Sequence, residues 1–208
     1  MTATGRFITL EGGEGVGKST QLRALEQAIR KRGIDCVVTR EPGGSEGAEA
    51  IRELLLQGDN SRWSIEAEAL LFAAARADHV EKTIRPAIGR GQWVLSDRFV
   101  DSSFAYQGAA SGLGIDRVRE LHEFACSGFL PDRTLVMSLA EGHERAKARD
   151  RDTVDRIGGR PEDFHQRVEL AFRTIAAEEP LRVRLIDASG TQAEVTGRLL
   201  DAIADLLP

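Results

Sequence analysis

Short runs rich in β-branched and aliphatic residues alternate along this chain with longer segments whose apolar residues recur at helical spacing. Within the longer segments, Leu22, Leu25 and Ile29 follow one helix face, and so do Leu170 and Ile175. Alternation of strands and helices favours crossover units, so we expect a doubly wound α/β fold: a five-stranded parallel sheet with helices on both faces. The strand candidates are Arg6–Gly12, Asp35–Arg40, Gln92–Asp97, Arg133–Leu139 and Arg182–Asp187.

One segment interrupts the alternation. Residues Arg145–Arg160 are rich in charge and end in Gly-Gly-Arg-Pro. We expect a small mobile insertion there, at about residues 145–160. The 208 residues are enough for one domain with a full core and too few for two, so the chain is predicted to form a single domain spanning 1–208.

Composition and charge narrow the functional classes. A net charge of −5 argues against a general nucleic-acid binder, although a local cluster of arginines could still hold phosphate. Cys36 and Cys126 form no CxxC or metal-ligand group, which predicts two reduced, buried thiols. There is no signal-peptide pattern, and the longest apolar run, Ala69–Ala75, is too short to span a bilayer. We therefore expect a cytoplasmic protein with no membrane or nucleic-acid partner.

A phosphate-binding loop follows the first strand candidate. The pattern Gly-x-x-x-x-Gly-Lys-Ser lets backbone N–H groups surround phosphate oxygens at a helix N-terminus. Lys18 would reach the outer phosphates, and Ser19 would offer a hydroxyl to Mg²⁺. The order of strand, loop and helix predicts a P-loop NTPase fold that binds a nucleotide, against the alternative of a chance glycine-rich turn. The residues expected to bind ATP are Gly12, Gly13, Glu14, Gly15, Val16, Gly17, Lys18 and Ser19.

The loop alone does not define the reaction. The chain has neither the Asn-Lys-x-Asp motif expected of a GTPase nor the Leu-Ser-Gly-Gly motif of transporter ATPases. Size and the remaining strand ends favour a small-molecule phosphotransferase. After the second strand, Thr39–Gly44 contains Pro42, which restrains Glu41 to an extended conformation. By itself this segment could be a plain turn.

The third strand candidate ends in Asp97 and Arg98. Asp97 is placed to hold the water shell of a metal ion, and Arg98 offers a planar fork suited to a second phosphate. The same pair could instead be a structural ion pair. Tyr106 follows, and on the residues alone it could serve only packing. No histidine has ligand spacing, and none is assigned a role.

Together these motifs resemble thymidylate kinase. The matching stretches are EGGEGVGKST, TREPGG, LLFAAARADHV, DRFVDSSFAYQG and DRI, in the order and approximate spacing of the family over nearly the whole chain. The resemblance implies ATP-dependent phosphorylation of thymidine monophosphate (dTMP) to the diphosphate (dTDP), a step in dTTP synthesis. It also implies Mg²⁺ as cofactor and a homodimer built through helices.

The resemblance assigns roles on the acceptor side. It implies that Phe72 stacks on thymine, that Arg76 contacts its polar edge, and that Arg98 binds the acceptor phosphate. Ser103 and Tyr106 would line the sugar pocket against a ribose 2′-hydroxyl. The implied substrate-binding residues are Glu14, Glu41, Pro42, Phe72, Arg76, Arg98, Ser103, Tyr106 and Gln107.

Charge near the transferred phosphoryl group is the open point. Glu14 would lie on the acceptor side near the sugar hydroxyl, where Mg²⁺ offsets its charge, although it could also be an exposed loop residue. One branch of the family has an arginine where this chain has Gly15. The other branch supplies this arginine from a lid, and Glu144–Arg160 resembles that lid. We expect Arg149 and Arg151 at the transfer site, against the alternative of a solvated charged helix.

The chain departs from the family at one position. The family usually has an acidic residue after DRI, whereas this chain has Gly158, so a lid contact made by that residue is in doubt.

The expected catalytic residues are Lys18, Arg98, Arg149 and Arg151. The expected metal ligands, partly through water, are Ser19 and Asp97. Rival readings are another nucleoside or nucleotide kinase, or a P-loop regulatory module that hydrolyses ATP slowly.

Overall fold

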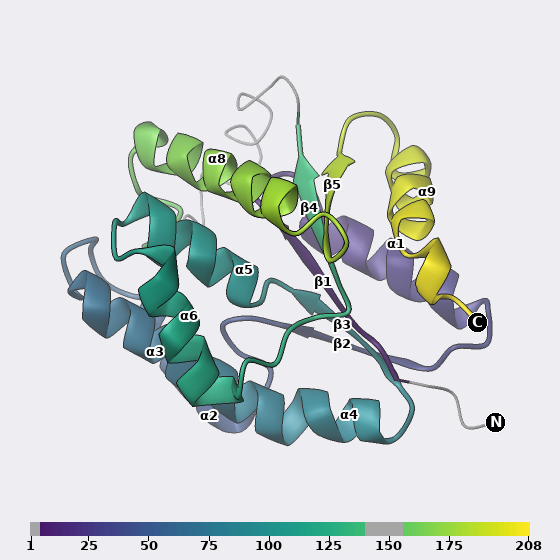
Figure 1. The fold of residues 1–208 in the computed structure, drawn as a ribbon, viewed down its shortest axis with the longest axis horizontal. Coiled ribbons are helices and arrows are strands. Elements are labelled where there is room, and N and C mark those ends of the chain that lie inside the picture. Colours follow the sequence, from purple (N-terminus) through teal and green to yellow (C-terminus); the bar gives the residue numbers. More distant parts are fainter. Residues whose placement is uncertain (1–4, 140–155) are drawn as a thin grey trace.

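The computed structural model describes residues 5–139 and 156–208. Within them, a parallel five-stranded sheet has the order β2-β3-β1-β4-β5 (Figure 1). Each expected strand is confirmed to within one residue at either end. The strands are β1 (Phe7–Gly12), β2 (Cys36–Arg40), β3 (Trp93–Asp97), β4 (Arg133–Ser138) and β5 (Val183–Asp187).

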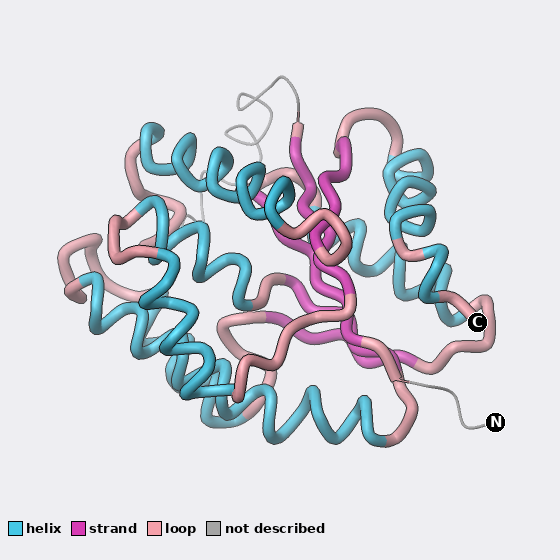
Figure 2. Tube along the Cα trace, viewed as in Figure 1, coloured by secondary structure: helices cyan, strands magenta, loops and turns pink. Residues whose placement is uncertain are grey.

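Helices cover both faces of the sheet (Figures 1 and 2). α1 and α9 pack on one face, and α4, α5 and α8 pack on the other. The helices are α1 (Lys18–Arg30), α2 (Glu46–Leu56), α3 (Ile65–His79), α4 (Arg85–Gly89), α5 (Val100–Ser103), α6 (Ile115–Cys126), α8 (Glu162–Glu178) and α9 (Gln192–Ala202). Two π-helical segments, η1 (Val80–Ile84) and η2 (Phe104–Ala110), and a 3₁₀ turn, η3 (Ala204–Leu206), complete the described elements.

The core has two apolar layers, one on each face of the sheet. Successive residues of β1 point to opposite sides, so Phe7 joins the layer under α8 while Ile8 joins the layer under α1. Strands buried on both faces read as continuous apolar runs, which is why the sequence pattern marked them so clearly. The expected doubly wound sheet is therefore confirmed. The two cysteines are free and buried, as the sequence predicted.

The helical pattern was wrong at one position. Leu170, which was expected to share the buried face with Ile175, is 65% exposed. The buried stripe of α8 instead runs through Val168, Phe172 and Ile175. These residues lie four and three positions apart, whereas Leu170 is five from Ile175 and so points elsewhere.

The strand order brings the sequence motifs to one edge. Leu10 of β1 and Arg40 of β2 both pair with Asp97, the last residue of β3. Parallel strands in register end at the same edge, where ligands bind in this type of sheet. In the part of the chain that the structure describes, no helix is long and apolar enough to cross a membrane.

Candidate active site

A cavity of about 500 Å³ lies at the carboxyl ends of β1, β2 and β3. On one side it is lined by the loop after β1, and on the other by side chains from α3, α5 and η2. Gly12, Gly13 and Val16 do not line it, and Arg149 and Arg151 lie outside the described residues. The predicted site residues that do line it are Glu14, Gly15, Gly17, Lys18, Ser19, Glu41, Pro42, Phe72, Arg76, Asp97, Arg98, Ser103, Tyr106 and Gln107.

Glycine is required where the phosphate loop passes β4. Gly12 has φ 126°, and a Cβ there would collide with the carbonyl group of Met137. Gly15 and Gly17 also have positive φ, 69° and 92°. The loop therefore turns its backbone back toward the start of α1, as a phosphate-binding loop needs.

Lys18 is folded back onto this loop. Its Nζ donates to the carbonyl oxygens of Gly13 at 2.6 Å and Gly12 at 3.2 Å. Burial, followed by repulsion from the Arg98 guanidinium, lowers the pKa of Lys18 to about 7. An ammonium held on two carbonyls beside a glycine-rich turn is ready to move onto phosphate oxygens.

Ser19 and Asp97 lie side by side, although 78 positions separate them in the chain. The Ser19 hydroxyl donates to Asp97 Oδ2 at 3.1 Å, at the exposed start of α1. A hydroxyl and a carboxylate are oxygen ligands of the kind that Mg²⁺ takes together with water and phosphate. The pair therefore fits a magnesium ion.

Arg98 occupies a strained backbone position. It has φ 69°, uncommon for a residue with a side chain, and its guanidinium donates to Gly12 O at 3.0 Å and Ser102 Oγ at 3.1 Å. The guanidinium carbon lies 5.2 Å from the centre of the Tyr106 ring. Strain of this kind persists only where the surroundings hold it in place.

Glu11, which the sequence analysis missed, holds that turn. Its carboxylate accepts from the backbone N–H of Phe99 at 2.7 Å and from Ser102 Oγ at 2.5 Å. Glu11 is fully buried, and burial together with the charge of Asp101 raises its pKa to about 8. The available signal was an acidic residue inside an otherwise apolar strand, which has to find a partner.

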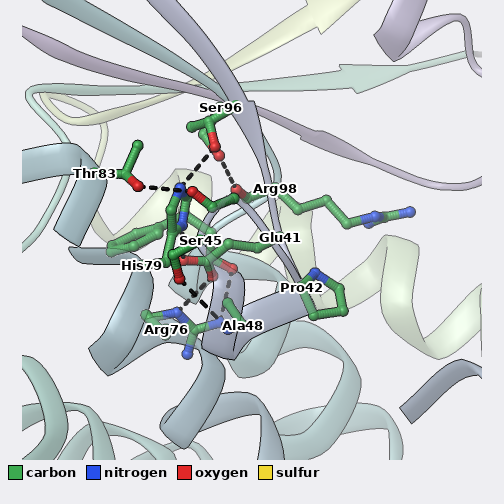
Figure 3. A network of polar contacts seen from close by, with 12 residues as sticks. Glu41, Pro42, Ser45, Ala48, Arg76, His79, Thr83, Ser96 and Arg98 are labelled. Carbon is green, nitrogen blue, oxygen red and sulfur yellow. Dashed lines mark hydrogen bonds and ion pairs between the residues drawn. The ribbon is translucent and has the colours of Figure 1, made fainter. Parts of the chain in front are cut away.

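A buried polar chain supports Arg76 (Figure 3). Arg76 donates to Glu41 Oε2 at 2.8 Å and to Ser103 Oγ at 2.9 Å. Glu41 Oε1 lies 3.0 Å from His79 Nδ1, and His79 Nε2 lies 2.7 Å from Thr39 Oγ1. In Figure 3 the Arg98 side chain extends away from this chain of contacts.

These buried polar contacts change the roles expected of Glu41 and His79. Both carboxylate oxygens of Glu41 are engaged by protein side chains, so Glu41 fixes Arg76 rather than offering a free acid to a ligand. His79, which received no role from the sequence, is fully buried in the same network. It lies three residues after Arg76 on α3, and that spacing was the signal that could have linked them.

Tyr106 and Gln107 belong to the π-helical segment η2. Tyr106 packs against Phe164 and Phe172, with ring centres 6.0 and 6.5 Å away. Burial raises the pKa of its hydroxyl, against the opposing charge of Arg98. The cavity also contains Arg40, which lies in the TREPGG stretch but received no role there, and Arg52, which lies in none of the motifs.

Comparisons with known proteins find the same family over nearly the whole chain. A family model described as thymidylate kinase matches residues 10–198. The chain is 60% identical over 207 residues to a thymidylate kinase of Rhizorhabdus wittichii, covering 98% of this chain and 99% of that one. It is 48% identical over 204 residues to a thymidylate kinase of Synechococcus sp., covering 97% and 96%. The solved structure of thymidylate kinase from Ehrlichia chaffeensis matches with a TM-score of 0.79 and 28% identity, covering 96% of this chain and 98% of that chain.

Proposed function

The chain belongs to the thymidylate kinase family and phosphorylates dTMP to dTDP, and we propose that ATP donates the phosphoryl group within the cavity described above. The fold is accordingly that of a P-loop NTPase. The observation that best supports the proposed site is the joining of the phosphate loop and the Phe72–Arg76 surface in one cavity of about 500 Å³.

The donor nucleotide occupies the loop after β1. Lys18 exchanges its contacts with Gly12 and Gly13 for oxygens of the outer phosphates. Ser19 and, through water, Asp97 would hold Mg²⁺, which would offset the negative charge of the phosphates. Glu14 lies on the acceptor side of the loop, near that charge.

The acceptor nucleotide lies opposite. Phe72 stacks on thymine and Arg76, oriented by Glu41, donates to a base carbonyl. Arg98 binds the acceptor phosphate from a turn fixed by Glu11. Tyr106 lines the sugar pocket together with Ser103, Pro42 forms part of the wall, and Gln107 lies on the base side.

Transfer needs positive charge around the moving phosphoryl group, because its transition state spreads negative charge over the equatorial oxygens. Lys18 supplies part of that charge. Arg149 and Arg151 supply the rest, an assignment that depends on the sequence alone. Position and charge suffice for this chemistry, so no protein nucleophile takes part.

Three helices provide the surface for a homodimer. α3 packs against both α2 and α6, and each carries an exposed apolar side chain: Leu54, Leu70 and Phe124, the last 91% exposed. Exposed apolar side chains gain free energy when a second subunit covers them, which supports association. Light scattering should give a dimer mass, and Phe124→Asp should shift it toward the monomer. The net charge of −5 and the two buried free thiols support a cytoplasmic enzyme with no nucleic-acid partner.

A coupled assay of ADP release tests the function directly. We expect ADP release from Mg-ATP only when dTMP is present, and little release with thymidine. Release without any acceptor would indicate a regulatory ATPase, and a preference for thymidine would indicate a nucleoside kinase. Either result contradicts the proposed reaction.

A further inference from the structure

A buried carboxylate outside the site described so far binds three side chains at once. Glu68 on α3 is 2% exposed. Its Oε2 accepts from Arg156 Nη2 at 2.5 Å and Arg160 Nη2 at 2.6 Å, and its Oε1 accepts from Gln107 Nε2 at 2.9 Å. One acidic group thus connects α3, η2 and the segment Arg156–Arg160.

Glu68 is ionised in this setting. Burial alone would raise its pKa, but the Gln107 hydrogen bond and the two guanidinium groups outweigh burial and lower it. An ionised carboxylate only accepts hydrogen bonds. The amide group that faces Glu68 Oε1 must therefore be the NH₂ of Gln107, which decides an orientation that the shape of the side chain leaves open.

The carbonyl oxygen of the Gln107 amide, Oε1, has a different environment. Gln107 is 1% exposed and lines the cavity. Among the described residues, none donates a hydrogen bond to its Oε1. Gln107 Oε1 is therefore the amide atom that remains to accept a hydrogen bond from a ligand in the cavity, and under the proposed function that ligand is the base.

We propose that Glu68 is a positioning residue that holds the Gln107 carbonyl oxygen toward the base and thereby selects pyrimidines with an N–H at ring position 3. This inference rests on the proposed function. Thymine and uracil carry that N–H, whereas cytosine has a lone pair there, which would face the lone pairs of Gln107. A buried acceptor without a donor costs about 1–3 kcal/mol, which corresponds to roughly 5- to 150-fold in kcat/KM.

Glu68 could also serve only to anchor Arg156 and Arg160, so the test has to separate this anchoring role from base selection. Arg156 also donates from Nε to Leu55 O at 2.8 Å, and its side chain is fully buried. Neutralising Glu68 would leave that guanidinium without its counter-charge, which destabilises buried pairs. A loss of overall activity alone would therefore say nothing about base selection.

The kcat/KM ratio for dUMP against dCMP isolates base selection. The two bases both lack the methyl group and differ only at ring positions 3 and 4. In Glu68→Gln, residue 68 can donate or accept, so the Gln107 amide is free to turn, and we expect the ratio to fall about tenfold or more. Arg76 remains, so some discrimination persists. The matched control is Glu66→Gln, an exposed acid on the same helix, and it should leave the ratio unchanged.

A purely anchoring role predicts equal losses for dUMP and dCMP in Glu68→Gln, and that result would overturn the inference. Thermal unfolding followed by circular dichroism reports whether this variant folds. If it does not, Gln107→Met decides, because it removes the amide while Glu68 keeps both arginines. An unchanged ratio in Gln107→Met overturns the inference, and a lowered ratio supports it. Activity of the parent on dTMP, measured alongside, tests the proposed function separately.

Discussion

The carboxylate of Glu14 lies directly against Gly158, in the space where a side chain at position 158 would begin. A Cβ built on Gly158 would lie 2.9 Å from the Glu14 carboxyl carbon, closer than real Cβ atoms come to another atom. The acid inside the phosphate loop and the glycine in place of the family's acid are therefore neighbours. An acidic group is present beside this position, and Glu14 supplies it.

This relationship predicts the effect of an acid at position 158. Gly158→Asp and Gly158→Asn both displace the exposed end of Glu14, but only aspartate adds like-charge repulsion. We expect the KM for dTMP to rise several-fold more in Gly158→Asp than in Gly158→Asn. Unfolding free energies should change by about 1 kcal/mol or less, since the displaced group is a flexible side chain. Equal KM values for the two variants would contradict a role for the Glu14 charge.

The predicted lid arginines can be tested by kinetics. Arg149 and Arg151 lie outside the described residues, and their assignment rests on the sequence. If they contact the phosphoryl group mainly in the transition state, Arg149→Ala/Arg151→Ala should lower kcat by about 10³-fold or more. KM should not rise to match. A folded double variant with the parent kcat would show that both arginines are solvated surface.

The loop limits any attempt to restore that charge from the other side. Gly15 has φ 69°, and a left-handed conformation costs a residue with a side chain about 1–2 kcal/mol. Gly15→Arg in the Arg149→Ala/Arg151→Ala background should therefore recover only a small part of kcat. Gly15→Ala in the same background is the control, because it carries the strain without the charge.

Most of the fold was predictable because its determinants are local. The end of β1 at Gly12 and that of β3 at Asp97 follow from where apolar runs meet loop residues. Motifs that follow parallel strands must gather at one edge, so Lys18, Asp97 and Arg98 could be expected around one cavity.

Buried polar partners were not predictable in this way. Glu11 and Phe99 are 88 positions apart, as are Glu68 and Arg156, and Glu41 and His79 are 38 apart. Each of these acids lies in or beside a run that reads as helix or strand. Nothing local says which distant group satisfies it, and only the folded chain brings the pairs together.

The structure sharpens the test of sugar selection. Because Tyr106 packs on Phe164 and Phe172, truncation to alanine would cost about 3–5 kcal/mol and confuse stability with specificity. Tyr106→Phe removes only the hydroxyl that faces the proposed sugar pocket. We expect the ratio of kcat/KM for dTMP over its ribose counterpart to fall about tenfold, since a 2′-hydroxyl gains room. An unchanged ratio would remove Tyr106 from sugar selection.

His122 should make stability depend on pH. Its Nε2 donates to Phe129 O at 2.8 Å, and its Nδ1 is buried with no partner among the described residues. Burial, together with the charge of Arg76, lowers its pKa to about 4 from 6.5. Below pH 6.5 the imidazole of His122 takes up a proton in the unfolded chain but not in the folded chain. The free energy of unfolding therefore decreases as the pH is lowered, until the imidazole is protonated in both forms below pH 4.

The expected loss from this group between pH 7.5 and pH 5 is about 2 kcal/mol. Urea unfolding at both pH values measures it. His122→Gln keeps a donor for Phe129 O and cannot titrate. Between pH 7.5 and pH 5, the unfolding free energy of this variant should therefore fall by about 2 kcal/mol less than that of the parent. His165→Gln, at a partly exposed site, should behave as the parent does. A parent and a His122→Gln variant with the same pH dependence would contradict the prediction.

Lys18 should couple ATP binding to proton uptake. Because its pKa is lowered to about 7, Lys18 is largely deprotonated in the free enzyme at pH 8. Bound phosphates supply negative charge that favours the ammonium form, so binding draws in nearly one proton at pH 8 and much less at pH 6. By linkage, ATP affinity should fall as pH rises above 7. Titration calorimetry in buffers of different ionisation enthalpy measures the uptake.

Two variants assign that proton. Lys18→Ala should abolish the uptake and lower kcat by orders of magnitude while the fold survives, because it removes the loop side chain that would reach the outer phosphates. Lys18→Arg keeps the charge but does not titrate in this range, so it should bind ATP without uptake. Uptake that persisted in Lys18→Arg would instead assign the proton to Glu11, whose pKa burial raises to about 8. Parent activity in folded Lys18→Ala would remove Lys18 from phosphoryl transfer altogether.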